Sequence, residues 1–300
     1  MSEPLLSKLV VIGVGLIGGS FALALKQAQA VRLVVGVGRS SRNLDVARRL
    51  GIADRTYTLR EAWTGELHDA DLIMLATPVG QMPSLFETIA RHVGRSSVLT
   101  DAGSTKRDVI AAARSHLGGS LSRFVAGHPI AGTEHSGAAA AFDSLYRDKA
   151  VVLTPIEATD ADAVDRVSAA WTQCGAAVSV LDAERHDSIF AAVSHLPHAL
   201  AFALVAELAA REDAAEYFRY AASGFRDFTR LAGSDPEMWR DICVANASAL
   251  RLELNVFREQ LARLDSLLAA PDSDALAALF TSARSARNAW LAMRDRDTEV

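Results

Sequence analysis

The sequence has little of several features that mark whole classes of protein. Only two cysteines, Cys174 and Cys243, occur in 300 residues, and they lie far apart and outside any ligand or redox motif. We therefore expect inert thiols and a reducing, cytoplasmic setting. Proline is scarce, and 50% of the residues are hydrophobic against 22% charged, which argues against disorder. With no low-complexity segment or internal repeat, the composition indicates an ordinary globular protein.

Basic clusters and long apolar runs are also missing. The net charge is -5 and the arginines are scattered among acids, so we expect neither nucleic acid nor a membrane surface as a partner. No basic stretch precedes the first apolar run, as it would in a secretory signal. No run reaches the roughly 18 apolar residues that a membrane span requires. The expected partner is a small molecule.

The order of the patterns predicts two domains. Up to about residue 180, short β-branched runs alternate with alanine- and leucine-rich stretches, which is typical of a parallel sheet with crossover helices. After Leu181 only helical spacing continues, to Trp290, with a break at residues 271–273. We predict an α/β fold, with a doubly wound Rossmann-type domain over residues 1–181 and an all-helical domain over 182–300. The expected strands span residues 8–13, 31–38, 71–77, 97–101, 123–127, 150–155 and 177–182.

The segment GVGLIGGS follows the first expected strand and opens a helical stretch, so G-x-G-x-x-G stands here in its dinucleotide-binding context. Gly13 permits the tight turn, Gly15 lets the backbone approach a pyrophosphate, and Gly18 lets the helix pack on the strand. Leu16 and Ile17 begin the helix, whose unpaired amide groups face the phosphates. The segment predicts a dinucleotide site, and an ordinary glycine turn is the alternative.

The end of the second strand bears on the choice of nucleotide. An acidic residue about 20 positions after the glycine motif would hold the ribose 2'-hydroxyl, but Gly38 stands there. Arg39 can pair with a 2'-phosphate, and Ser40 can hydrogen-bond it. The sequence favours NADP over NAD, and the alternative is that Arg39 stacks on adenine without choosing between them.

Polar residues follow two later strands, at the edge of the sheet where ligands bind in such folds. Thr77 and Pro78 leave a strand where a nicotinamide would lie. Ser104, in the segment DAGSTK, is expected to begin a helix. Its hydroxyl serves as an N-cap worth roughly 1 kcal/mol, binds substrate, or does both.

A third segment, GHPIAGTEHSG, places His128 at a strand end before a proline that fixes the backbone. A hydride acceptor bound nearby needs a base for the proton of the alcohol being oxidised, and histidine is the usual choice. The alternative is a structural histidine. Glu134 and His135 lie on the following turn, where a surface pair is the commoner role.

The helical half carries two further polar groups. His195 and His198, in SHLPH, have a spacing that suits metal binding, but no third ligand motif accompanies them, so we expect no metal. Arg226 and Arg230 lie four residues apart among aromatic residues, a pattern that suits carboxylate binding. A solvated basic face is the alternative. The segment from Asp187 to Ala210 is apolar around most of its circumference, which predicts a helix buried in a bundle or at a subunit interface.

Taken together, these segments resemble the prephenate/arogenate (cyclohexadienyl) dehydrogenase family of tyrosine biosynthesis, in the same order and from about Lys8 to Trp290. The glycine motif is generic, whereas the histidine loop and the segment FRDFTR are specific. The resemblance implies NAD(P)-dependent oxidative decarboxylation, in which hydride leaves C4 of the substrate ring and the ring carboxylate departs as carbon dioxide. Prephenate would give 4-hydroxyphenylpyruvate, and arogenate would give tyrosine. It also implies a homodimer intertwined through the helical domain.

The resemblance assigns roles residue by residue. His128 matches the catalytic histidine, and Ser104 matches the serine that orients the substrate hydroxyl and that histidine. Arg230 matches the arginine that holds a substrate carboxylate. The other matched substrate-binding positions are Ser194 and His198 on the helical wall, Glu134 at the mouth, Asp187 and Trp239 around the site, and Arg226, which stands where relatives often have a lysine reaching in from the other subunit.

Two other functions fit parts of the pattern. A two-domain dehydrogenase of the β-hydroxyacid type would use a lysine base on a helix, but the helical half contains no lysine. A non-catalytic dinucleotide sensor would keep the fold without the chemistry. The presence of His128, Ser104 and Arg230 together argues against that sensor.

Overall fold

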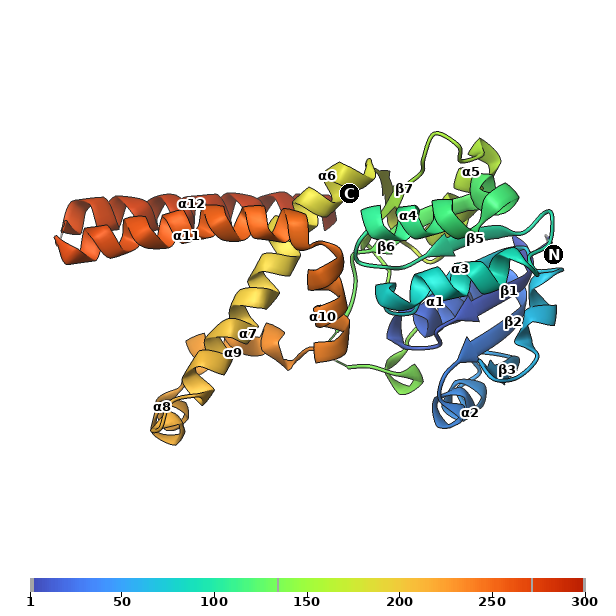
Figure 1. The fold of residues 1–300 in the computed structure, drawn as a ribbon, viewed down its shortest axis with the longest axis horizontal. Helices are drawn as coiled ribbons and strands as arrows, with labels where there is room; N and C mark the ends of the chain where they lie inside the picture. Colours follow the sequence, from blue (N-terminus) through green and yellow to red (C-terminus); the bar gives the residue numbers. More distant parts are fainter. Residues whose placement is uncertain (1–2, 134, 271, 299–300) are drawn as a thin grey trace. The chain divides into compact units, whose positions relative to one another are not determined.

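The computed structural model describes residues 3–133, 135–270 and 272–298 (Figure 1). The chain forms two compact units, one up to Ala247 and the other from Ser248. The first unit contains the whole β-sheet and the helices that follow it up to residue 247. This division falls later than residue 181, because the first helices of the helical half pack against the sheet domain. The functional boundary at residue 181 stays a prediction.

A single sheet of eight strands forms the centre of the first unit, in the order β3-β2-β1-β4-β5-β6-β7-β8. The order from β3 to β6 is that of the doubly wound Rossmann fold, which confirms the predicted fold class. The strands are β1 (Leu6–Ile12), β2 (Val31–Gly38), β3 (Arg55–Thr58), β4 (Leu72–Leu75), β5 (Val98–Asp101), β6 (Phe124–Pro129), β7 (Ala150–Thr154) and β8 (Ala177–Val180).

The sheet differs from the expected one in two places. The sequence pattern did not predict β3, because it is a four-residue edge strand without a buried apolar run. β7 pairs with β6 in the antiparallel direction, whereas the other strand pairs are parallel. Parallel neighbours require a crossover of a dozen or more residues, usually a helix. Between β6 and β7 the described residues form only one short 3-10 turn, Ala138–Ala140, so the chain returns antiparallel.

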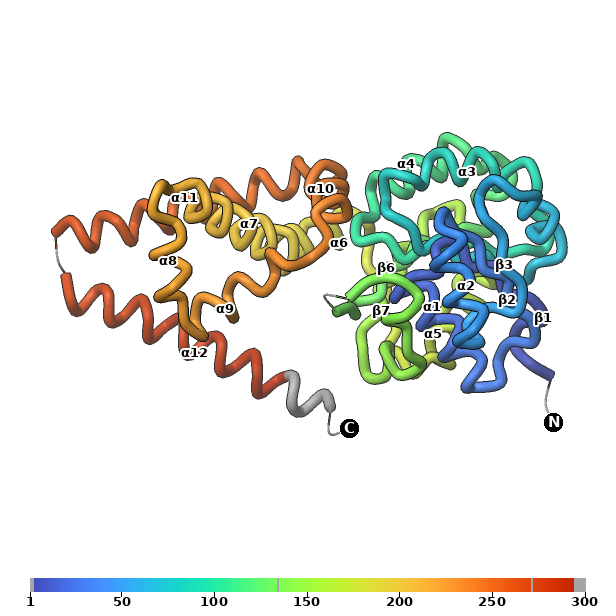
Figure 2. The backbone as a smooth tube through the Cα atoms, turned by 90° about the horizontal axis from the view of Figure 1, so that it is seen from below, coloured from blue at the N-terminus to red at the C-terminus, as the bar shows by residue number. Residues whose placement is uncertain are grey.

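Helices cover both faces of the sheet. Alternate residues of β1 point to opposite sides, Leu9 and Val11 into one apolar cluster and Val10 and Ile12 into the other. The first cluster is closed by α1 (Leu16–Gln27), α2 (Ser41–Arg49) and α5 (Ala161–Gln173), and the second by α3 (Met82–Ala90) and α4 (Arg107–His116). Figure 2 shows α3 and α4 on one side of the strands with α1, α2 and α5 on the other.

The rest of the chain is helical, as predicted. A π-helical turn, Ala191–His195, joins α6 to α7, and α11 ends at Ala269 before α12 begins at Ser273. Many large apolar side chains in this part are exposed, among them Leu204, Tyr220, Phe228, Val244, Leu252, Val256 and Phe280. Exposed apolar surface of this extent is typical of an interface. The helices are α6 (Ala183–Phe190), α7 (Leu196–Ala209), α8 (Ala214–Tyr220), α9 (Ser223–Thr229), α10 (Pro236–Ala245), α11 (Ala247–Ala269) and α12 (Ser273–Thr298).

The continuous helical stretch Ala183–Ala209 corrects one expectation. By length and composition it is apolar enough to cross a membrane, although the sequence was expected to contain no such stretch. A core or interface helix of a globular protein passes the same test. Most of this apolar stretch is not buried within the described chain, so the expectation of a helix buried in a bundle also fails. A position at a subunit interface stays a prediction.

Candidate active site

The glycine turn between β1 and α1 has the local geometry that a dinucleotide site needs. Gly13 has a φ of 102°, and a Cβ on it would lie 2.3 Å from the carbonyl oxygen of Ala76. A Cβ on Gly18 would lie 2.3 Å from the carbonyl oxygen of Gly13, so helix and strand approach closely only because this residue has no side chain. Nothing lies within 4 Å of a Cβ placed on Gly15. The backbone there faces open space, and Leu16 and Ile17 begin α1 with no side-chain cap on its amide groups.

The segment after β4 lies beside this turn, because β1 and β4 are neighbours at the point where the strand order reverses. Thr77 is half-buried, and its hydroxyl has no hydrogen-bond partner among the described residues. Pro78 precedes the 3-10 turn Val79–Gln81. The structure thus brings Thr77 and Pro78 to the crevice in which doubly wound folds bind nucleotides.

Arg39 and Ser40 are both exposed after β2. The hydroxyl of Ser40 accepts a hydrogen bond of 3.3 Å from the amide of Asn43 and so caps α2. Arg39 makes no hydrogen bond or ion pair with any residue in the described ranges. Its guanidinium group is therefore available to a ligand.

His128 is the penultimate residue of β6 and is 9% exposed. Its Nδ1 lies 2.8 Å from Nε2 of His186, whose own Nδ1 lies 2.8 Å from Oδ1 of Asp187. The ring of Phe190 packs on both histidines, with centroid distances of 4.7 and 4.5 Å. Two residues of α6 thus form a hydrogen-bonded chain to the histidine predicted as the base.

Burial controls the charges in this chain. It lowers the pKa of His128 well below 6.5, and repulsion from His186, Lys106 and His195 lowers it further, the two histidines acting only when they are protonated. Burial also lowers the pKa of His186, although Asp187 opposes this. For Asp187 burial acts to raise the pKa, but hydrogen bonds from His186 and from two backbone amides hold it below its usual value. At neutral pH the chain therefore consists of two neutral imidazoles and a carboxylate.

A buried ion pair supports the strand that carries His128. Nζ of Lys106 lies 2.5 Å from Oδ2 of Asp101 and donates a hydrogen bond of 2.5 Å to the carbonyl oxygen of Gly127. Both charged side chains are fully buried. Asp101 also accepts hydrogen bonds from the amides of Gly103 and Gly127. The turn after β5 is in this way fixed to the residue before His128.

Ser104 lies on that turn and is half-buried, but it does not cap a helix as expected. Helix α4 begins at Arg107, and its cap is the carboxylate of Asp187, which accepts hydrogen bonds from the amides of Lys106 and Arg107 at 2.8 and 3.0 Å. Asp187 is 2% exposed and its oxygens are occupied by these partners. No described residue hydrogen-bonds the hydroxyl of Ser104, so this side chain is free for substrate.

Four of the predicted substrate-binding residues meet on the helical side. The rings of His198 and Trp239 stack, with centroids 3.5 Å apart and planes 17° apart. Nδ1 of His198 donates to the carbonyl oxygen of Ser194 over 2.8 Å. Burial lowers the pKa of His198, and the charge of nearby Arg230 lowers it further. A neutral histidine stacked on an aromatic ring, close to an exposed arginine, suits the binding of a small ligand whose ring carries carboxylates.

His195 lies between this group and Asn246, and its ring meets that of Trp239 edge-on, with centroids 6.1 Å apart. Nδ2 of Asn246 lies 3.1 Å from Nδ1 of His195 and also donates to the carbonyl oxygen of Asp187 over 2.8 Å. Burial lowers the pKa of His195 to about 4. Its Nε2 is buried without a partner among the described residues. These contacts make it a neutral structural histidine next to the chain from Asp187.

The structure does not bring all the predicted residues together. Arg226 is exposed, and its only ion-pair partner in the described part of the chain is the neighbouring Asp227, at 3.8 Å. Helix α9 ends at Thr229, so Arg226 and Arg230 do not share one regular helix. Glu134 lies outside the described residues. His135 is exposed.

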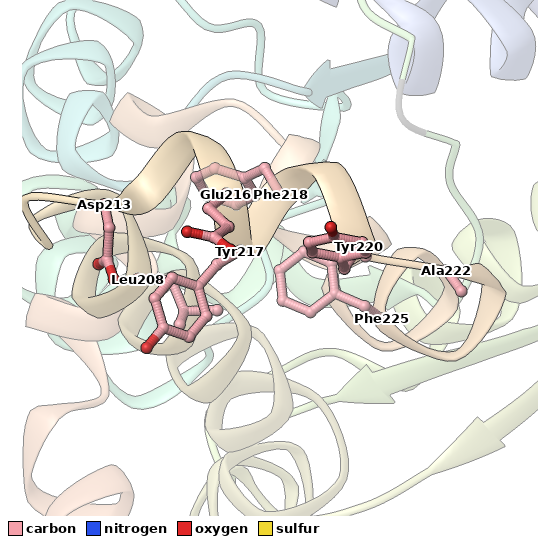
Figure 3. A pocket seen from close by; sticks show the side chains of 9 residues that line it. Leu208, Asp213, Glu216, Tyr217, Phe218, Tyr220, Ala222 and Phe225 are labelled. Carbon is pink, nitrogen blue, oxygen red and sulfur yellow. The ribbon is translucent and has the colours of Figure 1, made fainter.

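A hollow of about 550 Å³ opens elsewhere, between the end of α7, α8 and the start of α9. Figure 3 shows the rings of Tyr217, Tyr220 and Phe225 on its wall. It contains none of the predicted site residues. Its lining is Leu208, Asp213, Glu216, Tyr217, Phe218, Tyr220, Ala221, Ala222 and Phe225.

Comparison with known families agrees with this geometry. The family model of the prephenate dehydrogenase nucleotide-binding domain matches residues 21–180, and that of the prephenate dehydrogenase dimerization domain matches residues 182–282. The chain belongs to the prephenate dehydrogenase family. It is a dehydrogenase whose first domain binds a nicotinamide nucleotide, although this family name does not itself choose between NAD and NADP.

Individual members of the prephenate dehydrogenase family resemble the whole chain. The cyclohexadienyl dehydrogenase of Zymomonas mobilis is 34% identical over 93% of this chain and 94% of its own length. The prephenate dehydrogenase of Bacillus subtilis is 32% identical over 93% of this chain and 75% of its own length. The crystal structure of prephenate dehydrogenase from A. aeolicus with hydroxyphenyl propionate and NAD+ covers 94% of this chain and 97% of its own, with 34% identity and a TM-score of 0.87.

Three residues of the site were not predicted from the sequence. His186 and Lys106 are buried polar side chains that connect distant segments, and Asn246 lies beyond the segments that carried a motif. The adjacent pair His186 and Asp187 at the start of a long apolar helix was an available signal, because charged groups enter an apolar stretch only with partners. Lys106 ends DAGSTK, but its target, the carbonyl of Gly127, cannot be read from spacing.

Proposed function

We propose that the protein catalyses the NADP-dependent oxidative decarboxylation of a cyclohexadienol carboxylate, prephenate or arogenate. The observation that carries this proposal is His128, a neutral histidine at the carboxyl end of β6 whose Nε2 has no partner in the described ranges. Family membership supports the reaction type. Alternative dehydrogenases of the β-hydroxyacid type lack support, because residues 182–300 contain no lysine to act as the base.

In this reaction the residues divide the tasks. Bound cofactor supplies the acceptor for the hydride from C4 of the ring. His128 takes the proton of the C4 hydroxyl on Nε2, since Nδ1 is engaged by His186, and returns it to the ring oxygen once the carboxylate has left and the ring is aromatic. Ser104 orients that hydroxyl with its free side chain. Loss of the ring carboxylate as carbon dioxide makes the ring aromatic, which drives the reaction, so the protein has mainly to position the substrate and remove a proton.

Arg230 is proposed to bind a substrate carboxylate beside the stacked rings of His198 and Trp239. A charge-assisted hydrogen bond contributes about 1.5–3 kcal/mol, which corresponds to roughly 10- to 100-fold in affinity. We therefore expect Arg230→Ala to raise KM by this factor with a smaller change in kcat, as measured by initial rates against substrate concentration. Arg219→Ala, at an exposed arginine of α8, is the matched control. An unaltered KM in Arg230→Ala would remove this assignment.

The cofactor preference is proposed to be set by Arg39 and Ser40. No carboxylate stands at the end of β2 to repel a 2'-phosphate, and Arg39 is exposed and unpaired in the described chain. The relative from A. aeolicus was crystallised with NAD+, so the comparison does not decide the preference.

Replacing Arg39 tests the nucleotide preference. We expect Arg39→Ala to raise KM for NADP by roughly tenfold or more and to leave KM for NAD nearly unchanged, because only the 2'-phosphate loses a charged partner. Arg49→Ala, at the far end of α2, is the control. Equal effects on both nucleotides would instead indicate stacking of Arg39 on adenine.

We also propose a cytoplasmic homodimer formed through the helical part, with a substrate domain that begins after residue 181. The apolar side chains exposed on α7 to α12 and the match to a dimerization domain support it. Light scattering in solution would then give twice the chain mass of 32.0 kDa.

One assay tests the reaction itself. Purified protein is offered prephenate or arogenate, each with NAD or NADP, and nicotinamide reduction is followed. The four initial rates identify the substrate and the cofactor together. Nucleotide binding without turnover in any of the four mixtures would indicate a sensor and contradict the proposal.

A further inference from the structure

The proposed base of this site has an unusual set of buried partners. The chain Asp187, His186, His128 is connected by two hydrogen bonds of 2.8 Å. His186 is fully buried and Asp187 is 2% exposed, so water does not compete for these contacts. Both residues come from α6, whereas His128 lies on β6. The contact therefore joins the helical part to the sheet at the reacting group.

The order of donors and acceptors in the chain follows from Asp187. Its carboxylate accepts hydrogen bonds from two backbone amides and has no proton to give, so Nδ1 of His186 must donate to it. A neutral His186 then has a bare Nε2, which must accept a hydrogen bond from Nδ1–H of His128. The proton of neutral His128 is thereby fixed on Nδ1, and its lone pair is on Nε2.

We propose that His186 is a positioning residue that holds His128 in the Nδ1–H tautomer and so keeps Nε2 available as the proton acceptor. The role of Nε2 as the proton acceptor rests on the proposed function. When His128 takes the substrate proton, its positive charge is stabilised through His186 by the carboxylate of Asp187, as a carboxylate stabilises an imidazolium in hydrolytic triads.

The groups around the pair are consistent with this role. From α6, Asp187 is the anion of the chain, and the ion pair between Asp101, the last residue of β5, and Lys106 is hydrogen-bonded to the backbone of Gly127. His195 is a further neutral imidazole, held by Asn246. Lys106 disfavours a proton on either histidine. Asp187 and Asp101 both favour a charge on His186, and Asp187 is the anion that hydrogen-bonds it when the substrate proton arrives.

Two substitutions at residue 186 separate positioning from packing. His186→Phe keeps a ring against Phe190 but removes the acceptor for Nδ1–H of His128. His186→Gln keeps an acceptor for His128 and a donor for Asp187. In metal sites, loss of the hydrogen-bond partner of a ligand histidine typically costs about 10- to 100-fold, and we take the same order for the partner of His128. We expect a fall of this size in kcat for His186→Phe, with KM and nucleotide affinity nearly unchanged, and a smaller fall for His186→Gln.

Two further readouts distinguish this role from a structural one. In protein labelled with ¹⁵N-histidine, without ligands, wild type and His186→Gln should show His128 protonated on Nδ1, and His186→Phe should show a mixture of tautomers. The pH at which kcat/KM falls on the acid side should also shift in His186→Phe, because His128 loses its hydrogen-bond partner. Melting temperatures measure any loss of folding in each variant.

The outcomes are separable. An unchanged kcat and an unchanged tautomer in His186→Phe would overturn the inference, and so would equal losses of kcat in His186→Phe and His186→Gln. If wild-type protein turns over neither prephenate nor arogenate, the proposed function fails. The NMR measurement still decides the tautomer in that case, because it needs no turnover.

Discussion

Replacement of His128 by alanine should reduce kcat by about 10² to 10⁴, the contribution that a general base typically makes. The loss should appear in kcat because the proton is removed in the chemical step, while Kd for the nucleotide should stay unchanged, since the glycine turn lies after a different strand. Stopped-flow or initial-rate kinetics with the preferred substrate and a fluorescence titration of the nucleotide measure the two quantities.

Two further variants make this result specific. His128→Asn keeps a donor for His186 but has no basic nitrogen, so it should lose as much activity as His128→Ala. His135→Ala, at an exposed histidine of the segment that follows β6, should keep the wild-type rate. If His128→Ala or His128→Asn retained wild-type turnover, His128 would not be the base.

The pH dependence of the wild-type enzyme follows from the same environment. Burial lowers the pKa of His128, so its neutral, active form persists below the usual value of 6.5. Protonation removes the base, so kcat/KM should fall as the pH falls through this lowered pKa and not near pH 6.5.

The largest effect on stability is expected from Lys106. In Lys106→Met the carboxylate of Asp101 stays buried without its charged partner, and removal of one member of a buried ion pair costs about 3–5 kcal/mol. The free energy of unfolding, measured in urea at fixed protein concentration, should fall by this amount. The hydrogen bond to the carbonyl oxygen of Gly127 is lost as well, so activity should fall with stability.

Two companion variants test whether the unpaired charge of Asp101 causes the loss of stability in Lys106→Met. Adding Asp101→Asn to Lys106→Met removes that charge but keeps an oxygen for the amides of Gly103 and Gly127, so part of the lost stability should return. Lys149→Met changes an exposed lysine and should have little effect. A loss below about 1 kcal/mol in Lys106→Met, the value typical of an exposed pair, would contradict the buried-pair explanation.

The fold could be predicted from the sequence to the extent that local patterns determine it. Apolar β-branched runs predicted seven of the strands, and the change to helical spacing after Leu181 predicted the helical half. Strand β3 carries no such run, and the direction of β7 depends on how the chain returns from β6, which no local pattern encodes. The compact unit that ends at Ala247 likewise reflects packing between segments distant in the sequence.

The candidate site shows the same division. His128 could be proposed because a proline and small residues surround it, and Arg230 because aromatic residues flank it. The partners of His128 could not be predicted in this way. His186 lies 58 residues away along the chain and reaches His128 only through a contact between helix and strand. Ser104 was expected to cap a helix, but the cap comes from Asp187, which is 81 residues distant from the amide of Lys106.

The carboxylate of Asp187 also determines where the protein can be divided. An isolated nucleotide-binding domain that ended at residue 181 would expose the first amides of α4 and leave His128 without its partner. The turn that carries Ser104 would also lose the hydrogen bond between the amide of Lys106 and Asp187. Dissection or domain exchange in this protein should therefore retain α6 with the sheet, and a chimera joined after Phe190 would keep the base and its two supporting residues from one parent.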